Sequence, residues 1–242
     1  MAKTKLLIDG DILLYQSIAG TERELEFEPG EYVLTTNIND AKDAFQQKLN
    51  ALLDRANINE YVLALSGDAN FRQELYPQYK APRKSTRKPL GFKDFKAWVI
   101  SEFEPAMKPN IEADDVIGIL ATKPGTDYVI WSIDKDLKQI PGKHLDGDKI
   151  KLITKEEGDR MHLYQTLIGD TTDNYPGCPG IGPAKANKLL DGFWKEPWAE
   201  VVQAFDAAGL TYEDALTQAR LARILQFPNW NSDTQSIIHW EP

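Results

Sequence analysis

Acidic residues recur along this sequence at spacings that suit the binding of divalent cations. Asp170 and Asp173 are three positions apart, so in a helix or turn they face the same way and can hold one hard cation through oxygen. Further carboxylates follow predicted strands or open a predicted helix: Asp9, Asp68, Glu112, Asp114, Asp115, Asp134 and Asp136. Oxygen ligands suit Mg²⁺ or Mn²⁺, and two such ions about 4 Å apart can hold the attacking and leaving oxygens of a phosphodiester displacement. The pattern therefore predicts metal-dependent hydrolysis of phosphodiester bonds.

Short apolar runs predict the strands that would bring these carboxylates together. Residues 5–11, 61–65 and 127–133 read as buried strands followed by aspartate, and in a parallel sheet such strand ends lie along one edge, where α/β proteins place their sites. A helix predicted at 111–121 adds acidic residues at its N-terminus, where the helix dipole favours negative charge. Two unit charges near 4 Å repel by about 4 kcal/mol at an effective dielectric of 20, so cations are the natural compensation. Each aspartate alone could be a cap or turn residue, but that does not explain why three buried strands end this way.

The remaining periodicity predicts one α/β domain with a helical extension. A further short strand is expected at 149–153, a hairpin at 24–35, and helices at 12–19, 40–56, 92–103, 160–169, 198–208 and 212–224. No apolar run approaches the roughly 20 residues that a membrane span needs, so we expect a cytoplasmic monomer without membrane contact. A single cysteine, Cys178, excludes an intrachain disulfide, and three histidines leave little material for a zinc site.

Two stretches predict contact with an anionic polymer. Gly180 and Gly182 let backbone N–H groups approach a phosphate closely, and a helix starting near Pro183 adds its positive dipole end and Lys185. A glycine turn of this kind is also common as simple punctuation between elements. The second stretch, from Lys80 to Lys96, is cationic although the whole chain has a formal net charge of -9. Residues 71–90 contain three prolines and no helical periodicity, which predicts a mobile basic loop or arch. The like charges of Lys80 to Lys96 repel one another unless something anionic binds there.

These motifs, taken in chain order, resemble those of the flap endonuclease and 5′-to-3′ exonuclease family, and most of all its small phage-encoded exonucleases. The resemblance spans about residues 6–190. It implies a PIN-like α/β domain over residues 1–157 with a mainly parallel central sheet and a basic arch at about 71–96. A helical region over 158–242, with a helix-hairpin-helix at about 176–190, would complete the metal site.

The resemblance also implies roles for individual residues. Two Mg²⁺ ions, for which Mn²⁺ can substitute, would sit among the nine carboxylates, while Asp11 lies outside the shared set. Lys80 and Arg83, with the neighbouring Tyr79, would act on the scissile phosphate. DNA contacts would come from the arch and the hairpin: Arg72, Lys84, Arg87, Lys88, Gly180, Gly182 and Lys185. The substrate would be DNA with a 5′ end, whether duplex, nicked or flapped, and an RNA-DNA hybrid is a further option. More weakly, the resemblance implies a K⁺ ion at the hairpin. If a phage encodes the protein, it would act in the cytoplasm of the host cell.

Two other interpretations remain open at this point. Residues 6–13 also fit the Asp-x-Asp loop of haloacid-dehalogenase-like phosphatases, in which Asp9 would be a nucleophile and Asp170 and Asp173 a distal acidic motif. That interpretation leaves the carboxylates of 112–115 and 134–136 and the hairpin without a role. A non-catalytic helix-hairpin-helix DNA-binding protein would use the hairpin and the basic loop but would not need the acidic residues.

Overall fold

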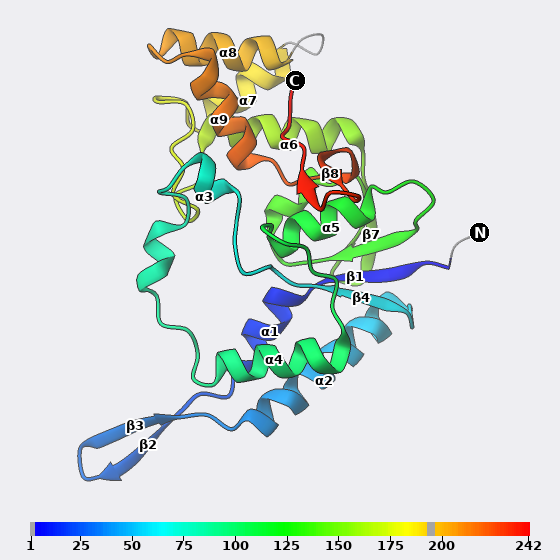
Figure 1. Ribbon diagram of the computed structural model, residues 1–242, viewed down its shortest axis with the longest axis vertical. Coiled ribbons are helices and arrows are strands. Elements are labelled where there is room, and N and C mark those ends of the chain that lie inside the picture. Colours follow the sequence, from blue (N-terminus) through cyan, green and yellow to red (C-terminus); the bar gives the residue numbers. More distant parts are fainter. Residues whose placement is uncertain (1–2, 193–196) are drawn as a thin grey trace.

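A five-stranded sheet forms the centre of the protein in this computed structural model, which describes residues 3–192 and 197–242 (Figure 1). Its order is β4 (Tyr61–Ala64), β1 (Lys5–Asp9), β5 (Tyr128–Trp131), β6 (Gly142–Asp146) and β7 (Lys149–Ile153). The first four strands run parallel, and β7 pairs antiparallel with β6. The expected α/β fold with a mainly parallel sheet is confirmed. Strand β6 was not predicted, because residues 142–146 have no continuous apolar run.

Side chains of β1 alternate between two hydrophobic cores, one on each face of the sheet. Leu6 and Ile8 face helices α1 (Gly10–Ala19), α2 (Ile38–Ala56) and α4 (Phe92–Phe103), where Phe45 and Phe95 pack together. Leu7 points to the opposite face, onto α5 (Ala113–Ala121). Because side chains alternate with a period of two along a strand, a continuous apolar run is what a strand covered on both faces requires.

The C-terminal helices form a third core and return to the sheet. α6 (Lys155–Ile168), α7 (Pro183–Gly192), α8 (Pro197–Ala207) and α9 (Tyr212–Ala222) surround Leu167 and Phe205. Helix α6 starts five residues before the predicted residue 160, because Thr154 and Glu157 form a capping box. After α9, η3 (Phe227–Asn229), β8 (Trp230–Asn231) and β9 (Ser236–Ile237) pack against the α5 face of the sheet. The division into residues 1–157 and 158–242 therefore stays a prediction, since part of the second range completes the core of the first.

Two connections reach away from these layers. The predicted hairpin forms as β2 (Arg23–Glu28) and β3 (Glu31–Thr35), and Figure 1 shows it projecting from the body beyond α2 and α4. The basic arch, residues 71–96, is not an irregular loop throughout: it contains α3 (Arg72–Leu75), the 3-10 helix η1 (Ala81–Ser85) and the start of α4. Over residues 3–192 and 197–242, no helix is long and apolar enough to cross a bilayer.

Candidate active site

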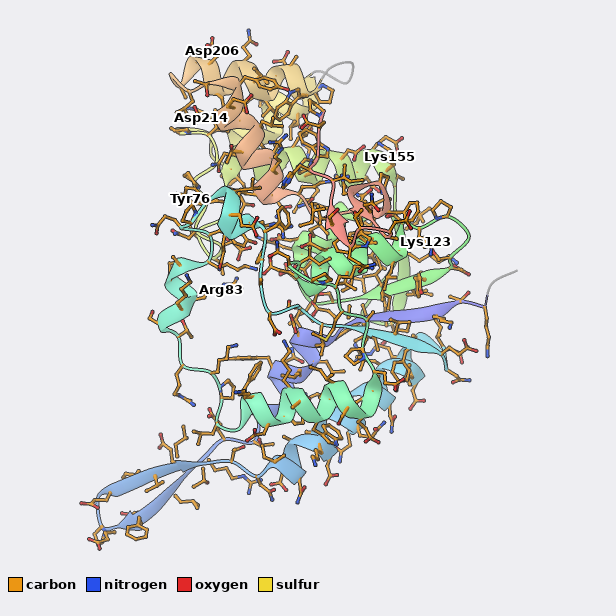
Figure 2. The ribbon with its side chains drawn as sticks, viewed as in Figure 1. Tyr76, Arg83, Lys123, Lys155, Asp206 and Asp214 are labelled. Carbon is orange, nitrogen blue, oxygen red and sulfur yellow. The ribbon has the colours of Figure 1, made fainter. Side chains whose placement is uncertain are left out.

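Eight carboxylates line one cavity of about 300 Å³ at the carboxyl edge of the sheet: Asp9, Asp11, Glu112, Asp114, Asp134, Asp136, Asp170 and Asp173. Lys80, Arg83 and Lys135 line the same cavity. Figure 2 shows Arg83 on the arch, which runs down one side of the molecule from α3 to α4. The structure thus brings together acidic residues from four separate stretches of the chain.

The ends of strands and helices position the carboxylates of Asp9, Asp134, Glu112 and Asp114. Asp9 ends β1 and caps α1, so one carboxylate oxygen accepts from Ile12 N at 3.2 Å and the other from Ser132 Oγ at 2.8 Å. Asp134 caps the 3-10 helix η2 (Lys135–Gln139), which follows β5, and accepts from Asp136 N at 2.9 Å. The N-terminus of α5 contributes Glu112 and Asp114. Local capping therefore explains how Asp9, Asp134 and Glu112 are oriented.

A tight loop after α6 supplies Asp170 and Asp173. Asp170 Oδ1 accepts from the backbone N–H groups of Thr172 at 2.6 Å and Asp173 at 2.9 Å. Gly169 and Gly177 make the loop possible: both have positive φ, and a Cβ on Gly177 would come within 2.3 Å of Gly169 N. The turn geometry expected for the two aspartates is present.

Burial and mutual repulsion raise the pKa values of the clustered carboxylic acids. Burial, with Asp11 and Asp134 adding repulsion, raises the pKa of Asp9 to about 7. Burial and nearby charges raise the pKa of Asp136 to about 6 and that of Asp114 well above its ordinary value. Asp136 Oδ1 is also buried without a hydrogen-bond partner among the residues that the structure describes. Crowded oxygens and an unsatisfied carboxylate fit a hard divalent cation, which would favour the ionised forms.

Cations of the arch contact the rim of this cavity. Arg83 bonds Asp173 at 2.7 Å, and Lys80 bonds Glu112. Tyr79 Oη lies 2.8 Å from Asp173 Oδ2 and 3.0 Å from Glu112 Oε2. Although burial acts to raise the pKa of Glu112, the charges of Lys80 and Arg72 lower it to about 2. With these pairings in place, no three His, Cys, Asp or Glu side chains in the described parts of the chain are spaced as ligands of one metal ion.

Three predicted site residues lie elsewhere. Asp115 is fully buried and bonds Arg72 through both oxygens, at 2.7 and 2.8 Å, so it is not placed as a metal ligand. Arg72 is 4% exposed and therefore cannot contact DNA as predicted. Asp68 is exposed and does not line the cavity, because β4 ends at Ala64 and the following loop turns Ser66 inward instead.

Asp11 takes a position that the sequence interpretation did not give it. Its carboxylate accepts from Ser66 Oγ and, at 3.3 Å, from Ser66 N, and it lines the cavity beside Asp9. Burial raises its pKa. The Asp-x-Asp spacing immediately after a buried strand was the signal that could have identified it.

The predicted DNA-contact residues occupy exposed positions, apart from Arg72. Gly180, with φ of +75°, and Gly182 form the exposed turn before α7, and Lys185 Nζ donates to Gly180 O at 2.9 Å. On the arch, Lys84 and Lys88 are exposed, while exposed Arg87 makes a two-pronged ion pair with Glu22 at 2.7 and 2.8 Å. The arch and the turn before α7 therefore both offer cations or free backbone groups to an anionic polymer.

A parallel α/β sheet with clustered carboxylates at its carboxyl edge, and cations poised beside them, defines a phosphodiester-cleaving nuclease. The chain belongs to the 5′-3′ exonuclease family: residues 4–166 match the model of the 5′-3′ exonuclease N-terminal resolvase-like domain. It is 31% identical to the exodeoxyribonuclease of Enterobacteria phage T3, over 98% of this chain and 92% of that one. It is 30% identical to the exonuclease of Escherichia phage T7, over 98% and 93%.

A solved structure shows the same fold. The T5 5′-exonuclease with bound zinc has a TM-score of 0.66 at 14% identity, covering 91% of this chain and 89% of that one. The family model and the two phage relatives show that the chain is a nuclease, so the phosphatase and the non-catalytic DNA-binding interpretations are wrong.

Proposed function

We propose that this chain hydrolyses DNA from 5′ termini with two divalent metal ions held in the carboxylate cavity. The observation that carries the proposal is the convergence of eight carboxylates from four stretches of the chain with Lys80 and Arg83 at their rim. The presence of metal ions in the T5 neighbour supports it. Because two relatives are phage proteins, we place the activity in the cytoplasm of an infected host cell.

The carboxylates that would hold the ions come from strand and helix ends and from a loop that meet at the cavity. Asp9, Asp11, Glu112 and Asp114 come from β1, α1 and the start of α5, and the remaining four come from η2 and the loop after α6. Mg²⁺ fits this all-oxygen set, and Mn²⁺ would substitute for it. When bound, such ions polarise a phosphate and lower the pKa of water.

The arch residues bring positive charge to the scissile phosphate. Lys80 and Arg83 are already held at the cavity by Glu112 and Asp173, so each can exchange a carboxylate for a phosphate oxygen with a short side-chain movement. Tyr79, whose single hydroxyl proton lies between two carboxylates, orients the same pair. The exposed lysines of the arch and the Gly180 to Lys185 turn would hold the DNA backbone. The proposal also includes a K⁺ ion bound at this turn. It further includes an RNA-DNA hybrid as a second substrate.

A digestion panel tests this function. Linear, nicked and flapped duplexes with a labelled 5′ end should lose the label in Mg²⁺ or Mn²⁺, and closed circular duplex should resist. EDTA should stop the reaction. Asp136→Asn should abolish turnover, whereas the matched exposed variant Asp233→Asn, in the turn between β8 and β9, should retain it. Full activity in EDTA, or shortening of the strand from its 3′ end with the 5′ label retained, would contradict the proposal.

A further inference from the structure

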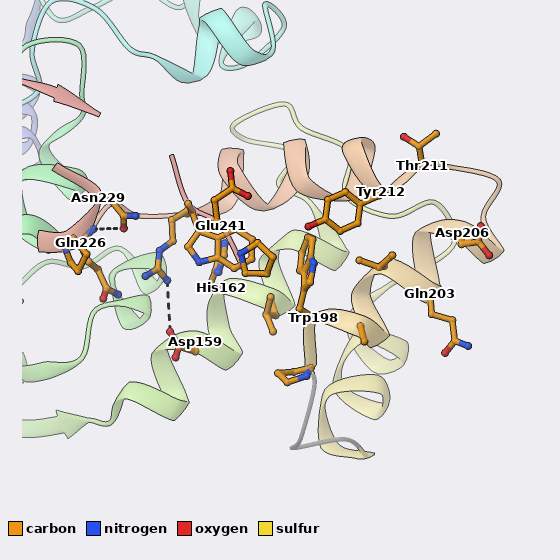
Figure 3. Close-up of a pocket in the computed structure, with 18 of the residues that line it drawn as sticks. Asp159, His162, Trp198, Gln203, Asp206, Thr211, Tyr212, Gln226, Asn229 and Glu241 are labelled. Atoms are coloured by element: carbon orange, nitrogen blue, oxygen red, sulfur yellow. Dashed lines mark hydrogen bonds and ion pairs between the residues drawn. The ribbon is translucent and has the colours of Figure 1, made fainter. Parts of the chain in front are cut away.

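A second cavity, much larger than the active site, lies among the C-terminal elements. It measures about 1180 Å³ and is formed by the first half of α6, α8, the start of α9 and the last residues of the chain (Figure 3). None of the carboxylates of the active site lines it. The cavity therefore has no part in the nuclease chemistry proposed above.

Arg223 is a buried cation with no adequate partner in this cavity. Its side chain is only 8% exposed, and its Nε and NH1 atoms make no hydrogen bond to any residue that the structure describes. The nearest carboxylate oxygen, Asp159 Oδ1, is 3.8 Å from NH1, which is too long for a hydrogen bond (Figure 3). Burial accordingly lowers the pKa of Arg223.

Arg72 shows how this protein satisfies a buried guanidinium when the need is structural. It is equally buried, and it bonds both oxygens of Asp115 and the carbonyls of Leu221 and Arg223. A buried charge without such bonds is costly, so the unsatisfied donors of Arg223 point to an anionic ligand.

Aromatic rings form the opposite wall of the cavity. Trp198 packs edge-on against Tyr212 at 6.0 Å and against Trp240 at 5.1 Å, measured between ring centroids. Figure 3 shows Trp198 and Tyr212 side by side, apart from Asp159. The indole Nε1 of Trp198 is buried and lacks a hydrogen-bond partner in residues 3–192 and 197–242. The wall thus offers apolar surface together with one free donor.

We infer that this cavity docks a peptide segment of a partner protein, in which a carboxylate bonds Arg223 and an aromatic side chain packs against Trp198 and Tyr212. Trp, Tyr and Arg are the residues enriched in the energetic centres of protein interfaces. The cavity exceeds the roughly 300–1,000 Å³ of a small-molecule site, which favours a segment of several residues.

The charges that line the cavity favour a carboxylate over a nucleic acid strand as the ligand. The lining carries three acidic residues, Asp159, Asp206 and Glu241, against two basic ones, Lys155 and Arg223. A strand with one phosphate per nucleotide would meet this surplus of negative charge, whereas a single carboxylate neutralises the one unsatisfied guanidinium.

Two matched peptides test the inference in the full-length protein without DNA or metal. The probes are acetyl-Asp-Ala-Phe-amide and the same peptide with Asn in place of Asp, titrated by NMR of the indole N–H signals. The acidic peptide should shift the Trp198 signal, identified by its loss in Trp198→Phe, and the Asn peptide should bind about tenfold more weakly, since a charge-assisted pair is lost. Arg223→Met should remove this difference and leave nuclease turnover unchanged.

Other results would overturn the inference. These are equal affinity for the two peptides, no binding of either, or the same Trp198 shift caused by thymidine 5′-monophosphate, which would indicate a nucleotide site. Thermal unfolding of Arg223→Met and Arg223→Lys separates a structural role: a large loss of stability in both would mean that Arg223 supports the fold instead. The readouts are binding and stability, so they do not depend on the proposed nuclease function.

Discussion

Removing the charge of Arg72 should destabilise the fold strongly. It should not remove a direct DNA contact, because the Arg72 side chain is buried against Asp115. The substitution Arg72→Met leaves Asp115, which is fully buried, with only the backbone N–H groups of Glu112 and Leu225 as partners, at 3.2 and 2.9 Å. It also leaves the carbonyls of Leu221 and Arg223 without their guanidinium donor. Breaking a buried pair by removing one partner costs about 3–5 kcal/mol. For a chain of this size that corresponds to a fall in Tm of about 6–20 °C.

Thermal and urea unfolding, followed by circular dichroism, measure this effect. The matched control is Arg23→Met, because the Arg23 side chain is 72% exposed and its ion pair with Asp40 is 3.7 Å long. It should change stability by no more than about 0.5 kcal/mol. Asp115→Asn should destabilise as Arg72→Met does, and Arg72→Met combined with Asp115→Leu should recover part of the loss, because no unpaired charge remains buried.

The DNA-contact interpretation of Arg72 predicts a different outcome. In that case Arg72→Met would keep the Tm of the wild-type protein, weaken DNA binding and lower the slope of log affinity against log salt by about one unit. Likewise, Asp115→Asn with normal stability but impaired metal binding would restore Asp115 as a ligand. Either result would refute the structural role assigned here to this pair.

Three further predictions concern the grip, the catalytic rim and acid stability. Lys185→Ala should weaken DNA binding and lower the slope of log affinity against log salt by roughly one unit, while turnover at saturating DNA is retained. Lys149, an exposed lysine of β7, is the matched control, and Lys149→Ala should change neither the affinity nor the slope. Binding titrations at several salt concentrations check this. Lys80→Ala should lower both the affinity for DNA and the single-turnover rate at saturating DNA, because positive charge is lost where charge develops on the phosphate. An unchanged rate would show that Lys80 has no catalytic role. Burial and the charge of Arg223 lower the pKa of His162 to about 3 from an ordinary 6.5, so the unfolded chain binds this proton first. The contribution of His162 to stability should therefore fall by about 1.4 kcal/mol per pH unit between pH 6.5 and about 3. His162→Gln should remove this contribution in urea titrations between pH 6 and 4, and a pH dependence equal to that of the wild type would contradict the buried neutral state.

The sequence alone determined most of the architecture, because it depends on local pattern. Continuous apolar runs identified β1, β4 and β5, and the aspartates after β1 and β5 indicated where a site would form. Helices whose periodicity is strong, such as α2 and α4, were predicted to within two residues. Resemblance to a known nuclease family, which the comparisons confirmed, rested on the same residues in the same order.

Only the tertiary structure decided which charged residues meet. Asp114 and Asp115 are adjacent on α5, but successive helical residues point about 100° apart, so one lines the cavity and the other turns inward to Arg72. The resemblance likewise assigned Arg72 to the DNA-contacting arch, although its partners Asp115, Leu221 and Arg223 are distant in sequence. The cavity around Arg223 has no local signal at all, since α6, α8, α9 and the C-terminal residues form it only when they pack together.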